Sequence, residues 1–142
     1  SDVCSSDLKE LGCHVSVQMK QVASTAGGIV TYLSVPSDAG TEDGDIAFTQ
    51  VGSSLTMAVS AGGAASSQVI PYDEGELAWW RIREADGVVH FETSRDGLSW
   101  LPQFSAETPG FAGAVSVNVG MGAPEPTSGA GFAIIDNLNV VP

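Results

Sequence analysis

The chain has 142 residues and a mass of 14.5 kDa, the size of one domain with a sizeable hydrophobic core. Its 5 Lys and Arg residues against 17 Asp and Glu residues give a formal net charge of −12 at pH 7. Phosphate groups are bound by clustered cations, so this balance argues against nucleic acid and anionic membranes as partners. No stretch approaches the roughly 18 apolar residues of a membrane-spanning helix, and no membrane insertion is predicted.

Glycine and proline are spread along the whole chain and constrain the fold class. The 17 Gly and 7 Pro leave residues 13–26 as the longest run without either, which gives helices little room. Even this run has a strand pattern, because Val15, Val17 and Met19 alternate with polar residues. We therefore predict an all-β protein.

The beginning of the chain is predicted to be an N-terminal tail over residues 1–12, followed by a single β-sandwich domain over residues 13–142. Residues 1–8, SDVCSSDL, look like the translated remnant of a sequencing adapter in a metagenomic contig; a natural polar linker is the alternative. Cys4 and Cys13 are able to close a short disulfide in an oxidising compartment. If Cys4 is foreign, Cys13 is simply a small strand residue.

The first half of the chain is predicted to hold strands over residues 13–22, 28–35, 45–51, 54–61 and 68–72. Strands 45–51 and 54–61 form a hairpin in which Ile46 and Phe48 face the core from one arm and Leu55 and Met57 from the other. Pro71 confines the last of these strands to a sheet edge or a strand end, because proline cannot donate a ladder hydrogen bond.

The second half is predicted to contain a three-strand meander over residues 77–84, 88–94 and 98–104, with Asp-Gly turns at 86–87 and 96–97. Alternation puts Trp80 and Ile82 in the core, and Trp79 on the opposite face of their strand. Strands over 113–121 and 131–141 follow. The total of about eight or nine strands is enough for an antiparallel β-sandwich.

Four short motifs occur in a fixed order: WRIR at 80–83, DG at 86–87, SRDGLSW at 94–100 and IDNLNV at 135–140. In this order they resemble the concanavalin A-like jelly-roll domains of secreted bacterial proteins, in the laminin-G-like and regulation-of-enolase-like group. The resemblance covers roughly residues 15–141 and implies a jelly-roll sandwich. Such domains usually begin several tens of residues earlier, so it also implies an N-terminal truncation that removes the first strands and bares a sheet edge.

The aromatic residues Trp79, Trp100 and Tyr72 are the candidate ligand-binding residues. Sugars present apolar C–H faces, against which an exposed ring stacks. Trp79 is expected on the outward face of its strand; packing under a second layer or beneath the arginines is the alternative. The structural alternative for Trp100 is that it plugs its hairpin.

The resemblance implies a further site at the last strand, where Asp136 and Asn137 match residues that hold a structural calcium ion in some jelly rolls of this type. Hard oxygen ligands suit Ca²⁺. Hydrogen bonding of Asp136 to backbone amides without metal is the favoured alternative. No other cofactor is predicted.

No catalytic residues are predicted. His90 and Glu92 share one face of a strand, but cross-strand pairing with Arg81 and Arg83 accounts for them. A glycoside hydrolase needs two carboxylates at a set separation, and no strand of this sequence carries such a pair.

The sequence therefore predicts a non-catalytic, extracellular module of a larger secreted protein, which binds a polysaccharide or another cell-surface polymer. Its partners would be a glycan and the neighbouring domains of the same polypeptide. A structural or interaction domain without glycan binding is one alternative. An ancillary domain of a glycoside hydrolase is the other.

Overall fold

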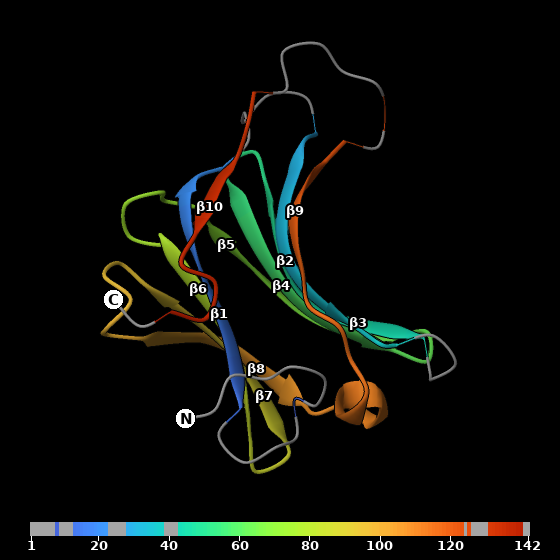
Figure 1. Cartoon of the computed structure of the whole chain (residues 1–142). Coiled ribbons are helices and arrows are strands. Elements are labelled where there is room, and N and C mark those ends of the chain that lie inside the picture. The colour runs from blue at the N-terminus through green and yellow to red at the C-terminus, as the bar shows by residue number, and fades with distance from the viewer. Residues whose placement is uncertain are drawn as a thin grey trace.

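The computed structural model describes residues 8, 13–22, 28–38, 43–123, 125 and 131–140. They form an all-β sandwich of two antiparallel five-stranded sheets (Figure 1). Sheet A has the order β10 (Ile134–Asp136), β1 (His14–Gln21), β6 (Trp79–Ala85), β7 (Val88–Ser94) and β8 (Leu101–Glu107). Sheet B has the order β5 (Ala64–Pro71), β4 (Ser54–Ala61), β3 (Gly44–Val51), β2 (Val30–Pro36) and β9 (Asn118–Gly122). These findings confirm the predicted fold class.

The core lies between the two sheets and is built by the alternating residues that the sequence predicts. Trp80 of sheet A is fully buried and stacks on Phe48 of sheet B, with ring centroids 5.5 Å apart. Phe48 also meets Phe91 edge-on at 5.2 Å. The indole N–H of Trp80 donates to the carbonyl of Leu77 at 2.9 Å, so its one polar atom is satisfied.

The Asp-Gly turn at 86–87 joins β6 to β7 as predicted, with positive φ at both residues. The next strand begins at Leu101 instead of residue 98, because the carboxylate of Asp96 holds a turn. Asp96 Oδ1 accepts hydrogen bonds from the backbone N–H groups of Leu98 and Ser99, both at 2.9 Å. These two amides are therefore withdrawn from strand pairing.

The strand predicted over 68–72 is longer and begins at Ala64. Gly62 and Gly63 both have positive φ and form a tight turn, so the chain pairs back along β4 at once. Pro71 is the last residue of this edge strand, as predicted.

The two predicted C-terminal strands are shorter in the structure. A short 3₁₀ helix, η1 (Gly110–Gly113), reaches into the start of the strand predicted over 113–121. The observed strand, β9, begins only at Asn118. The strand predicted over 131–141 pairs only over Ile134–Asp136. Beyond it, Asn137 and Asn139 adopt positive φ, which ends the regular strand.

The predicted tail, residues 1–12, lies outside the described residues except for Leu8. Leu8 is 1% exposed and belongs to the core cluster. Its backbone N–H donates to the carbonyl of Ala112 at 2.9 Å. Cys13 is disulfide-bonded, and Cys4, the other cysteine of the chain, is outside the described residues. No helix in the described part of the chain is long and apolar enough to cross a membrane.

Gly44 is a position where packing requires glycine. A Cβ atom added there would overlap the ring of Phe111 from η1 and lie 2.5 Å from the carbonyl oxygen of Ser60. We expect Gly44→Ala to lower the free energy of unfolding by about 1–3 kcal/mol, because a buried ring and backbone must move. Urea unfolding followed by tryptophan fluorescence measures this.

Gly122→Ala is the matched control, since a Cβ at that position meets nothing within 4 Å. Its unfolding midpoint is expected to stay at the wild-type value. Equal midpoints for Gly44→Ala and Gly122→Ala would contradict the packing of Phe111 on β3.

Candidate functional site

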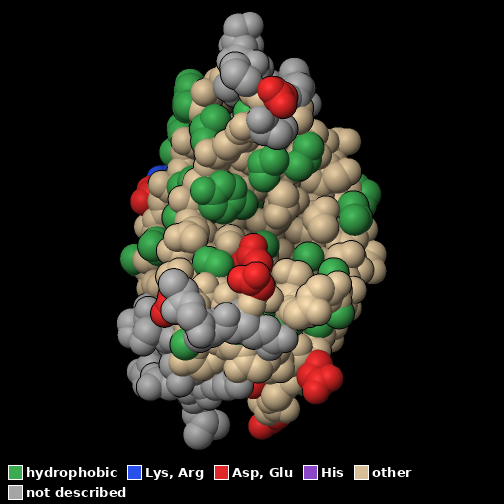
Figure 2. Space-filling view, turned by 90° about the vertical axis from the view of Figure 1, so that its right-hand side faces the viewer, with side chains coloured by type: hydrophobic (Ala, Val, Ile, Leu, Met, Phe, Trp, Pro, Cys, Tyr) green, Lys and Arg blue, Asp and Glu red, His purple; other side chains and the backbone are tan. Residues whose placement is uncertain are grey.

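The outer face of sheet B, which points away from the core, is the first candidate surface. Its strands bend along their length, so this face is concave toward solvent (Figure 1), and Figure 2 looks onto it. Residues opposite each other in antiparallel strands point to the same side, so the register sets them in rows. The outward residues of β2, β3 and β4 are mostly small or carry hydroxyl groups, namely Tyr32, Ser34, Ala47, Thr49, Thr56, Ala58 and Ser60.

Tyr32 brings an aromatic ring to this face and is half-buried. It lies opposite Gly120 of β9 on one side and Thr49 of β3 on the other. A Cβ atom at Gly120 would lie 3.2 Å from the hydroxyl oxygen of Tyr32, so the phenol lies over the backbone of Gly120. The missing side chain at position 120 thus leaves room for the ring to lie along the sheet.

Among the described strands of sheet B, Asp45 is the one acid, and these strands contain no Lys or Arg. Asp45 Oδ1 accepts a hydrogen bond from Ser34 Oγ at 2.7 Å, which holds the carboxylate along the sheet. In Figure 2 blue is visible at the left margin of the view and not over the middle of this face. The face therefore suits a neutral ligand better than an anionic one.

The outer face of sheet A holds a cluster of charged residues. Arg81 Nε donates to Glu92 Oε2 at 2.7 Å, and Arg83 Nη2 donates to Glu92 Oε1 at 3.2 Å. Glu92 lies opposite Arg81, and His90 lies opposite Arg83, which confirms the predicted cross-strand arrangement. Burial works to raise the pKa of Glu92, but hydrogen bonds and charges from Arg83 and Arg81 outweigh it and hold that pKa below its ordinary value.

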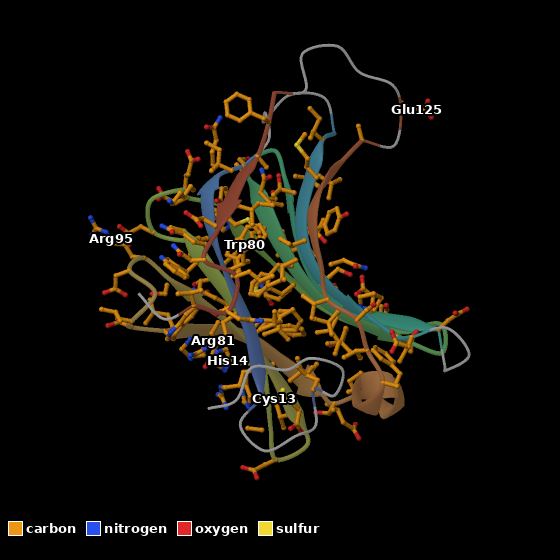
Figure 3. All side chains as sticks on the ribbon, viewed as in Figure 1. Cys13, His14, Trp80, Arg81, Arg95 and Glu125 are labelled. Atoms are coloured by element: carbon orange, nitrogen blue, oxygen red, sulfur yellow. The ribbon has the colours of Figure 1, made fainter. Side chains whose placement is uncertain are left out.

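A hollow of about 180 Å³ lies on the outer face of sheet A beside Trp100. The guanidinium carbon of Arg81 is 4.1 Å from the centroid of the Trp100 ring, a cation–π contact. Figure 3 shows Arg81 and His14, which both line the hollow, on the side of the sheet away from Trp80. Trp100 is thus the predicted ligand-binding residue that lies at a hollow, with Arg81 against its ring.

The other two predicted ligand-binding residues, Trp79 and Tyr72, do not line this hollow. Trp79 is 4% exposed, so its ring presents no open face to a sugar in this structure. Tyr72 packs edge-on against Trp80, with centroids 6.1 Å apart, and its buried hydroxyl has no partner among the described residues. Burial, with Glu74 and Asp73 adding to it, raises the pKa of Tyr72 above its ordinary value. The three aromatic residues do not form a shared stacking surface.

Asp136 and Asn137, the predicted metal ligands, lie at the end of β10. Asp136 is ion-paired with Lys20, and its Oδ1 accepts a hydrogen bond from the N–H of Asn137 at 2.8 Å. The side-chain amide nitrogen of Asn137, Nδ2, donates to Gln18 Oε1 at 2.7 Å. The hydrogen bond from Lys20 and then that from Asn137 lower the pKa of Asp136. In the described part of the chain, His, Cys, Asp and Glu form no group of three that could hold a metal ion.

A cavity of about 510 Å³ opens between the edges of the two sheets, where β4 and β5 face the end of β8. Its walls are mainly small and apolar, from Val59, Ala61, Ala64, Ala65, Ala106 and Pro109. Glu107 is the one carboxylate in its wall. The usual glycoside hydrolase mechanism uses two carboxylates across the substrate, and this cavity does not supply them.

Comparison with known proteins supplies no family, because no protein-family model and no curated protein matches the chain. The outer face of sheet B is not predicted as a candidate site by the sequence, although Tyr32, Thr49 and Thr56 hold outward positions of predicted strands. Their meeting in one row depends on the register of three strands, which alternation within each strand does not determine.

Glu92→Gln tests the charged cluster on sheet A. We expect the free energy of unfolding at pH 7 to fall by about 1–3 kcal/mol, because two half-buried arginines lose a charged acceptor. The folded protein holds the pKa of Glu92 below its ordinary value of 4.5. The stabilisation is therefore present above that pH and is lost as the pH falls through the lowered pKa.

Urea unfolding of both proteins from pH 7 to pH 3 measures the difference. Glu76→Gln is the control, because its ion pair with Arg95 spans 3.6 Å between exposed side chains. A gap between wild type and Glu92→Gln that widens toward low pH would contradict the assignment.

Proposed function

We propose that the chain is a non-catalytic module that binds a neutral polysaccharide on the outer face of sheet B. The observation that carries the proposal is the Tyr32 ring, which lies over Gly120 in a concave face lined with hydroxyl groups. An aromatic ring stacks on the C–H face of a sugar. Thr49 of β3 and Thr56 and Ser60 of β4 all lie on one side of the ring, and they supply hydroxyls for pairing with sugar hydroxyls.

The charge of the face selects the class of glycan. Asp45 is a hydrogen-bond acceptor for sugar hydroxyls, and it repels the carboxylates of uronic acids. The described strands of sheet B offer no Lys or Arg to an anionic polymer. The proposal therefore commits to uncharged polysaccharides such as glucans, mannans and xylans.

We also propose that the module is secreted as part of a larger protein. The disulfide at Cys13 supports an oxidising compartment, and hence secretion. Two antiparallel five-stranded sheets are compatible with a concanavalin A-like jelly roll, and we propose that the chain belongs to that group. The module would belong to a larger secreted bacterial protein and contact its neighbouring domains.

Affinity electrophoresis on gels containing single neutral polysaccharides tests the proposal. We expect retardation of the wild type by at least one of them. In Tyr32→Ala, affinity should fall at least about tenfold, which is about 1.4 kcal/mol, because the stacking ring is lost. Tyr32→Phe keeps the ring and should retain most of the binding.

Trp100→Ala is the control on the other sheet and should bind as wild type does. Binding that needs Trp100 but not Tyr32, prefers polyuronates and weakens with salt would move the site to the Arg81 hollow and overturn the proposal. Absence of binding to all neutral polysaccharides would overturn it too, in favour of a purely structural domain.

A further inference from the structure

β5 forms an edge of sheet B that is open along its whole length. It pairs with β4 through all 8 of its residues, and no other described strand lies on its far side. Every residue of β5 except Ile70 is exposed. Such an edge presents a row of backbone N–H and C=O groups that another strand can pair with.

The other three sheet edges carry features that oppose pairing, and β5 does not. β10 has 3 residues, and β9 has 5 with glycine at positions 120 and 122. β8 contains a register irregularity and Pro102. β5 pairs regularly with β4, has no charged residue, and holds its one proline, Pro71, at the very end. Charges, bulges and short strands are the usual protection of edges, so β5 stands out as unprotected.

Charge indicates which partner fits this edge. From Ile46 to Tyr72 the sequence has no charged residue, although the chain as a whole carries a formal net charge of −12. Two copies that approach through most of their surface repel each other, whereas two β5 edges meet through neutral segments. We propose that β5 of one copy pairs antiparallel with β5 of a second copy, which joins the two B sheets into one.

The geometry of such a pair follows from symmetry. A two-fold axis perpendicular to the sheet places one residue near the middle of β5, Ser67 or Gln68, opposite its own copy. The 510 Å³ cavity between the two sheets lies directly beside this edge, because Ala64 and Ala65 of β5 line it. The added strand extends the β5 wall of this cavity and brings further apolar surface against it.

Sedimentation and light scattering over a range of concentrations test the proposal on the full chain. We expect a dimer in the wild type. The double variant Ser67→Lys with Val69→Lys should raise the dimer dissociation constant at least about tenfold, because lysines then face lysines across the two-fold axis. Both positions are exposed, Val69 by 54%, so the monomer should fold normally by circular dichroism.

The matched control is Asn118→Lys with Gly122→Lys, which adds the same charge to β9, the opposite edge of the same sheet. Both positions are exposed, and a Cβ at Gly122 meets nothing within 4 Å. This variant should remain a dimer. A monomeric wild type, a dimer unaffected by the lysines in β5, or a dimer lost equally in both double variants would overturn the proposal. None of these results depends on whether the chain binds polysaccharide.

Discussion

The sandwich depends on one cluster of three aromatic rings between its two sheets. Phe48 is the sheet B member, and it meets Trp80 and Phe91 of sheet A with ring centroids 5.5 and 5.2 Å apart. All three side chains are fully buried. Because rings of this size fill the space between two sheets, they fix which face of each sheet is inside. Because side chains alternate along a strand, fixing the inner residues also fixes which residues of each sheet face outward.

The sequence predicts well what depends on alternation within one strand. The burial of Trp80 and Ile82 follows from period two, and the turn at 86–87 follows from its Asp-Gly pair. The start of β8 was mispredicted, because Asp96 satisfies two amides that a strand would otherwise use. Period two does not predict the surfaces to the same extent. Trp79 has the expected parity but is buried, and the row containing Tyr32 arises only from pairing between strands.

The two outer faces divide the chemistry of the molecule. Sheet A carries a charged cluster in which Glu92 binds two arginines at once, so the three side chains together keep a net positive charge. Sheet B has an uncharged stretch from Ile46 to Tyr72, with Asp45 just before it. A face with so few charges exerts little long-range electrostatic attraction on a ligand. It would therefore select its ligand by shape and by hydrogen bonding at short range. That property suits both a neutral glycan on the face and a neutral strand at its edge.

Pairing of two copies through β5 would also set how their two concave faces lie relative to each other. In an antiparallel pair related by a two-fold axis perpendicular to the sheet, a residue and its copy point to the same side. The two concave faces would then lie side by side on one surface, both open to the same polymer. A polysaccharide repeats its binding unit, so the second contact becomes intramolecular once the first is made, and affinity rises without any new type of interaction. If both proposals hold, weak stacking on each Tyr32 ring would suffice for retention on a long glycan chain.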